Sequence, residues 1–155
     1  MNLNKYQSPS SKSSRPDEEP WSGLHSVRFQ DSVSVDLSVL QEFKTLMGDD
    51  GDEIVIEVID LFLSDTPEKL VKMQQAIAHA DSEELRKAAH SLKSSSAGVG
   101  ATGLSALCQE LETIGHSGKI NNAQEKMLQV NIEYINTRDI LNSVAKNIGL
   151  ICVPA

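Results

Sequence analysis

The sequence predicts an all-α protein, an antiparallel four-helix bundle with an additional short N-terminal helix. From residue 36 onward, apolar side chains recur at intervals of three and four residues, which is the period of an amphipathic helix. The breaks between these segments are short, and no segment shows the alternation typical of a strand. Apolar residues make up 39% of the 155-residue chain, enough for one bundle core, and only 4% are aromatic, so we expect aliphatic side chains to fill that core.

The composition divides the chain into two parts. Residues 1–34 contain a Ser-rich run and an acidic, Pro-rich run, with few apolar side chains to bury. We therefore expect a disordered N-terminal tail, in which Trp21 and Phe29 are the candidate anchors. Residues 35–150 then form the helical bundle domain, which is an ordinary length for one domain.

The first two helices are predicted from their ends. Asp36 can cap a helix that ends at Gly48. A second helix is expected to open after Asp49-Asp50-Gly51-Asp52. The Thr-Pro pair at 66–67 predicts a fresh or kinked helix at that point, because proline favours the first turn of a helix, and this segment continues to about Ala80.

The third helix of the bundle begins at a capping-box variant formed by Asp81 and Glu84, and Gly98 and Gly100 end it. Its apolar residues gather on one stripe, as expected of a helix that packs on one face.

Two further helices complete the bundle. One is expected from about residue 101 to residue 114, with a stop at Gly115 and Gly118. Asn122 and Glu125 can cap the last helix. Cys108 lies on the apolar stripe of its helix, so we interpret it as a buried core thiol.

One histidine lies on the polar face of the helix over residues 83–97. On a wheel of ~100° per residue, His90 falls about 140° from Leu85, on the side that faces water. Its helical neighbours at i−4, i+3, i+4 and i+7 are Arg86, Lys93, Ser94 and Ala97. An exposed imidazole with two cations and two small side chains beside it predicts a docking surface with a nucleophile at its centre.

A longer pattern surrounds this histidine. Its members are His90, Lys93, Ser95, Ser96, Gly100, Ala101 and Leu104. Residues 104–112 continue it with the letters L-x-x-L-C-x-x-L-E, in register with the first part. Together they resemble the signature of histidine-containing phosphotransfer (HPt) domains, and the similarity extends over residues 36 to about 145. The pattern departs from the family at Ser94, where glycine is usual.

The resemblance implies a phosphoryl carrier of a two-component phosphorelay. His90 would accept a phosphoryl group from a receiver-domain aspartate and pass it to another receiver. The implied partners are response-regulator receiver domains and a hybrid sensor histidine kinase. The receiver would bring the Mg²⁺, so the chain itself would need no cofactor. Glu112 corresponds to a family position at which a polar side chain can orient the histidine.

The residue types fit this chemistry. A neutral imidazole is a competent nucleophile toward an aspartyl phosphate. Lys93 lies one helical turn from His90, where its ammonium could offset the phosphoryl charge, and Arg86 lies one turn before it. A plainer interpretation remains open for each side chain: a solvated histidine, a charged solvent face for Lys93 and Arg86, and a surface carboxylate for Glu112.

Motifs of a complete enzyme are missing from the sequence. We find no Walker lysine motif, no kinase glycine loop and no cluster with metal-ligand spacing. Residues 98–103 fit G-x-G-x-x-G by letter, but they follow a predicted helix, whereas a dinucleotide site requires a preceding strand. We therefore expect a carrier without a catalytic site for ATP. The alternative is a helical bundle that binds receiver domains without being phosphorylated.

The charge of the chain limits its partners. The net charge of −8 argues against nucleic acid or an anionic membrane as a partner, because both require a basic field. No apolar run approaches the ~20 residues that span a bilayer, and the polar N-terminal segment lacks the apolar stretch of a secretory signal. We expect a cytoplasmic monomer.

Overall fold

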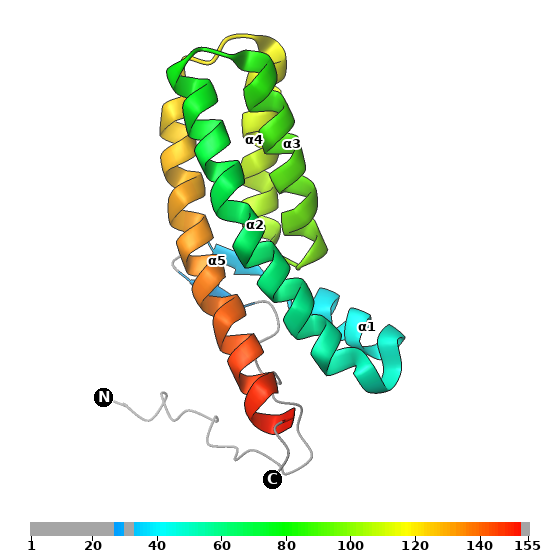
Figure 1. The fold of residues 1–155 in the computed structure, drawn as a ribbon. Helices are drawn as coiled ribbons and strands as arrows, with labels where there is room; N and C mark the ends of the chain where they lie inside the picture. The colour runs from blue at the N-terminus through cyan, green and yellow to red at the C-terminus, as the bar shows by residue number, and fades with distance from the viewer. Residues whose placement is uncertain (1–26, 30–32, 153–155) are drawn as a thin grey trace, which may run out of the picture.

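The computed structural model describes residues 27–29 and 33–152, and it confirms the predicted all-α bundle (Figure 1). Within these residues, four long helices run side by side and antiparallel, and a shorter helix projects from one end of the bundle. The elements in chain order are β1 (Val27–Phe29), β2 (Val33–Val35), α1 (Ser38–Met47), the 3₁₀ turn η3 (Gly48–Asp50), α2 (Gly51–Ala78), α3 (Ser82–Gly98), α4 (Thr102–Ser117) and α5 (Ala123–Cys152).

The core lies between the four long helices. α3 packs against α2 and α4, and α5 packs against the same two helices. The largest fully buried side chains are Leu37, Leu40, Ile59, Met73, Leu85, Leu92, Leu104, Leu111, Met127, Leu141 and Ile148. All are aliphatic or methionine, as the composition predicted. Cys108 is fully buried among them, and this burial raises the pKa of its thiol to about 12, which confirms the predicted core thiol.

The predicted helix start at Asp81 is confirmed, whereas the N-cap position of α1 is Leu37 and not the predicted Asp36. The Asp81 carboxylate accepts a hydrogen bond from the backbone N–H of Glu84 at 3.0 Å and caps α3. Asp36 acts one residue earlier than a standard cap. Its Oδ1 accepts from the N–H of Ser38 at 3.0 Å and from the Ser38 hydroxyl at 2.6 Å.

Proline 67 lies inside α2, which runs unbroken for 28 residues. The expectation of a fresh helix at this point is therefore wrong. A proline cannot donate to the carbonyl four residues before it, which is that of Leu63. The Leu63 carbonyl oxygen instead accepts a hydrogen bond from the Tyr134 hydroxyl on α5 at 3.4 Å, so it still has a hydrogen-bond partner.

Of the two glycines predicted to stop this helix, Gly118 is confirmed as the C-cap of α4, whereas Gly115 lies within the helix and does not end it. A glycine stands at this position because α4 lies close to the start of α3. A Cβ at position 115 would lie 2.8 Å from both the carbonyl oxygen of Ser82 and the backbone nitrogen of Arg86. Glycine at this position thus permits the tight packing of the two helices that carry the candidate site.

The turn between α3 and α4 depends on Gly100, a member of the signature pattern. Its φ is 81°, a conformation that side chains with a Cβ rarely adopt. Its carbonyl accepts from the N–H of Asp36 at 2.7 Å, and a Cβ would collide with the Asp36 carbonyl oxygen. The end of α3 is therefore held against the start of α1.

Two strands of three residues each were not predicted. β1 and β2 pair antiparallel, with Val27 opposite Val35, and β2 lies against α4 and α5. Val35 is 1% exposed. The predicted disordered tail ran to residue 34, so both strands depart from that expectation. Three residues are too few to show an alternating pattern. Trp21 lies outside the described residues.

Candidate functional site

The α3 helix presents His90 to solvent, as the helical wheel predicted. The buried residues of α3 are Leu85, Ala88, Ala89, Leu92 and Ser96, which lie on the predicted stripe. The His90 side chain is 57% exposed. A partner protein can therefore reach the imidazole ring without any rearrangement of the helix.

The ring of His90 is held by one carboxylate of the neighbouring helix. Nδ1 of His90 lies 2.9 Å from Oε2 of Glu112, on α4. The Glu112 side chain is 17% exposed, so it is less accessible to a partner than the ring that it contacts. The structure brings together the histidine and the side chain that the family resemblance placed beside it.

Lys93 contacts the same carboxylate. Its Nζ lies 2.7 Å from Oε1 of Glu112, so the two oxygens of Glu112 are divided between Lys93 and His90. Lys93 also donates to Oε1 of Gln109 at 3.0 Å. Lys93 thus lies beside the histidine, as expected, and is connected to the His90 ring through Glu112.

The charges of this group determine the tautomer of the ring. The contact with Lys93 is the largest influence on the pKa of Glu112 and lowers it below its usual 4.5; desolvation opposes this shift, and His90 adds a smaller lowering. Glu112 is therefore an ionised acceptor at neutral pH. Because a carboxylate only accepts, Nδ1 of His90 carries the proton, and in the neutral ring the lone pair is on Nε2.

Arg86, Ser94 and Ala97 occupy the positions expected from the wheel. Arg86 is paired within α3: its Nε lies 3.2 Å from Oε1 of Glu83, and this pairing raises the pKa of the guanidinium. Ser94 and Ala97 are both exposed and small, so the surface on these sides of the imidazole is open.

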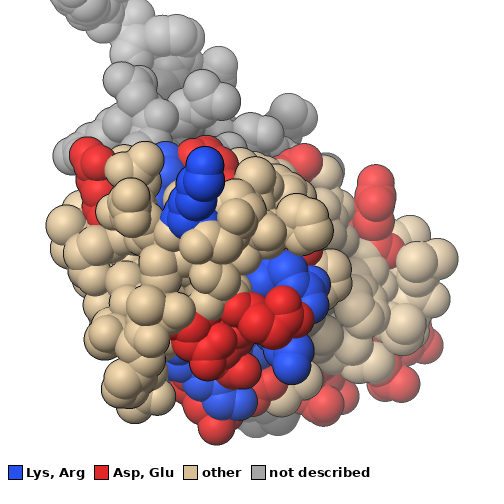
Figure 2. Space-filling view, turned by 90° about the horizontal axis from the view of Figure 1, so that it is seen from above, with Lys and Arg blue, Asp and Glu red and all other residues tan. Residues whose placement is uncertain are grey.

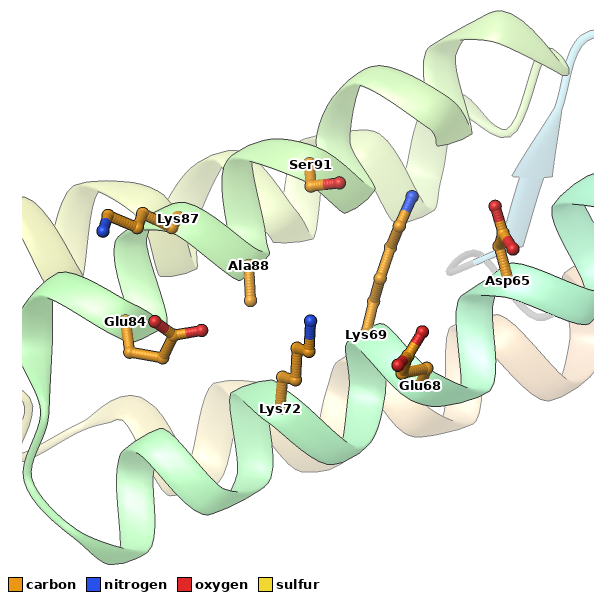
Figure 3. Close-up of a pocket in the computed structure, with 8 residues that line it drawn as sticks. All are labelled: Asp65, Glu68, Lys69, Lys72, Glu84, Lys87, Ala88 and Ser91. Atoms are coloured by element: carbon orange, nitrogen blue, oxygen red, sulfur yellow. The ribbon is translucent and has the colours of Figure 1, made fainter.

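The opposite flank of His90 is a charged cleft between α2 and α3, which the sequence did not predict (Figure 3). Its volume is about 240 Å³. The lining residues are Asp65, Glu68, Lys69, Lys72, Glu84, Lys87, Ala88 and Ser91. Lys69 and Lys72 reach from α2 toward α3 in Figure 3, and Nζ of Lys69 donates to the Ser95 hydroxyl at 3.3 Å. His90 thus stands between the Glu112–Lys93 pair and this cleft.

Charges of both signs alternate on the end of the bundle seen in Figure 2, where acidic side chains lie beside basic ones and no broad area carries one sign. In the part of the chain that the structure describes, no cluster of His, Cys, Asp or Glu could hold a metal ion. No helix among residues 33–152 combines the length and the apolar character needed to cross a bilayer.

Gln109 is the site residue that sequence reasoning missed. It lies one helical turn before Glu112 on α4, so a wheel drawn for α4 would have placed it on the same face. Neither its residue type nor its place in the pattern signalled a role. The lysines of α2 were missed for another reason, since the register of α2 against α3 cannot be inferred from either helix alone.

Comparison with known proteins agrees with the fold. Residues 57–140, more than half of the chain, match the Hpt domain family. The chain belongs to this family, the histidine-containing phosphotransfer domains.

The sequence is 29% identical over 97 residues to the phosphorelay intermediate protein YPD1 of Candida albicans, which covers 63% of this chain and 52% of that protein. The chain thus spans about half the length of the curated relative it matches. The crystal structure of histidine-containing phosphotransfer protein B (HptB) from Pseudomonas aeruginosa has a TM-score of 0.66 at 28% identity and covers 72% of this chain and 94% of that chain.

A rice protein described as a histidine-containing phosphotransfer protein has a TM-score of 0.67 at 20% identity, covering 77% of this chain and 84% of that chain. At this identity the likeness concerns the fold alone.

Proposed function

We propose that this chain is the phosphoryl carrier of a two-component phosphorelay, with His90 as the acceptor. The observation that carries the proposal is the exposed imidazole whose Nδ1 lies 2.9 Å from the Glu112 carboxylate. A histidine in a merely solvated position has no need of a fixed tautomer, whereas a nucleophile does. Membership of the Hpt domain family supports the same function.

The chemistry at His90 is a transfer between two proteins. The Nε2 lone pair attacks the phosphorus of a receiver's aspartyl phosphate, so a P–N bond forms while the P–O bond to the aspartate breaks and its carboxylate leaves. The ring becomes positively charged, and Glu112 stabilises that charge through the proton on Nδ1. Transfer to a second receiver is the reverse reaction. We propose that the partner supplies the Mg²⁺ for both transfers.

The surface around His90 fits a protein partner. Ser94 and Ala97 are exposed and small, so a receiver can approach the ring from their side of α3. Arg86 lies near the same surface and is paired there with Glu83. We propose receiver domains, one of them in a hybrid sensor kinase, as partners, and a cytoplasmic monomer as the working form.

The experiment is a transfer assay with the full chain. Receivers carrying ³²P-phosphoaspartate are mixed with the wild-type chain and with His90→Gln. We expect acid-labile label on the wild-type chain and none on the variant. If the chain binds receivers but takes up no label from any of them, it is an interaction module that is not phosphorylated.

A further inference from the structure

The charged cleft between α2 and α3 lies directly beside His90. Ser91 is the next residue along α3, Lys87 lies one helical turn before His90, and both line the cleft. A protein that docks on the imidazole ring therefore covers the cleft as well. The side chains of the cleft must then be matched by the surface of that protein.

The charges of the cleft are not paired with one another. Six of its eight lining residues are charged, namely Asp65, Glu68 and Glu84 with negative charge and Lys69, Lys72 and Lys87 with positive charge. In the part of the chain that the structure describes, the ion pairs lie elsewhere and none includes any of these six residues. Their charges are therefore available to a partner.

The charges on α2 follow an order along the helix. Asp65 and Glu68 line the cleft at its negative end, and Lys69 and Lys72 line the part that follows toward the C-terminus of α2. Figure 3 shows both lysines extending from α2 toward α3. Glu68 and Lys72 are one turn apart, which is about 6 Å along the axis at 1.5 Å per residue. A complementary surface carries a cation and an anion at a similar separation.

The size and chemistry of the cleft indicate a protein partner. Its volume of about 240 Å³ is below the range of about 300–1,000 Å³ usual for small-molecule sites, which are lined mostly by apolar groups. Covering an unpaired charge removes its hydration, and this costs free energy unless an opposite charge replaces the water. The cleft thus disfavours a partner whose surface is apolar or carries the same order of charges.

We propose that the α2–α3 cleft is a specificity site for the receiver domain that docks on His90. It selects a receiver whose surface carries an acidic side chain for Lys69 and Lys72 and a basic side chain for Asp65 and Glu68. This inference rests on the proposed function, which it deepens by naming the charge pattern of the partner.

The test uses receiver domains that bind the full chain, whether or not they label His90, and measures their affinity by isothermal titration calorimetry. The double variant Glu68→Lys and Lys72→Glu exchanges the two charges and leaves the net charge of the chain unchanged. It should weaken binding about 10-fold, as expected when charge-assisted contacts become repulsive. Both side chains are exposed, so the thermal midpoint should stay close to that of the wild type.

A single substitution and its control separate local contacts from the net charge. Lys72→Glu should also weaken binding about 10-fold. Lys146→Glu changes the net charge by the same amount at an exposed position of α5 outside the cleft, and it should leave the affinity close to that of the wild type. The effect of Lys72→Glu should shrink as salt rises from about 0.05 M to about 1 M, because salt screens exposed charges.

Three results would overturn the inference: equal binding of every such receiver by the charge-exchanged and wild-type chains, an equal loss of affinity for Lys146→Glu and Lys72→Glu, or no binding of any receiver to the chain. Failure of the proposed function is a separate outcome. It would be seen as receivers that bind through the cleft, with affinity sensitive to Lys72→Glu, and yet leave no label on His90.

Discussion

Glu112 on α4 lies 2.9 Å from the Nδ1 atom of His90 on α3, and this contact selects the nitrogen that is free to react. The other oxygen of the same carboxylate forms an ion pair with Lys93, at 2.7 Å. A carboxylate of the neighbouring helix thus orients the ring, while the ring itself stays in reach of a partner.

The first prediction concerns the pH dependence of stability. Since the pKa of Glu112 is lowered below 4.5 in the folded chain, the unfolded chain binds more protons between the two pKa values. The stabilisation is therefore complete above about pH 4.5 and is lost as the pH falls through the folded pKa. Urea unfolding of the wild type and Glu112→Gln should differ most at pH 6 and converge toward pH 3. A constant difference across this range would contradict the ion-paired state of Glu112.

The second prediction compares the two lysines that flank His90. Lys93→Ala should slow phosphoryl transfer by the equivalent of about 1–3 kcal/mol, a range typical of one charge-assisted contact. Lys87→Ala should have a smaller effect, because Lys87 lines the cleft on the other side of α3. Single-turnover rates with one receiver measure both. If both substitutions had equal and negligible effects on the transfer rate, Lys93 would belong only to a solvent-exposed charged face.

The sequence predicted the exposure of His90 because helical periodicity alone determines which face a residue occupies. The pairing of Glu112 with His90 came from the family resemblance, and the structure confirms their proximity. The contact of Lys93 with Gln109 could not be predicted, since it depends on the register of α3 against α4. The hydrogen bond from Tyr134 to the Leu63 carbonyl oxygen, which Pro67 leaves without its helical donor, depends likewise on the register of another helix.

The third prediction concerns the packing of α3 on α4. Gly115→Ala should lower the free energy of unfolding by about 1–3 kcal/mol, the usual cost of overpacking, because the new methyl group would meet the backbone of Ser82 and Arg86 at 2.8 Å. Gly98→Ala is the control, since a Cβ there has no atom within 4 Å. Denaturant unfolding measures both variants. If both variants are equally stable, the close approach does not depend on glycine.

The fourth prediction distinguishes two truncations. Deleting residues 1–26 should leave the thermal midpoint unchanged, because this segment has few apolar side chains to contribute to a core. Deleting residues 1–34 removes β1 and most of β2, which lies against α4 and α5, and should lower the midpoint. Differential scanning calorimetry compares the two. A large loss on the shorter deletion would show that Trp21 or its neighbours pack on the bundle.

Phosphoryl uptake by His90 is the central claim, and site-specific labelling tests it most directly. After incubation with a phosphorylated receiver, phosphohistidine in the wild-type chain should map to His90 alone. His90→Gln should carry no label while its helicity and thermal midpoint stay close to those of the wild type, because the side chain is 57% exposed. Label that persists in this variant, or that maps to His79 or another residue, would contradict the assignment.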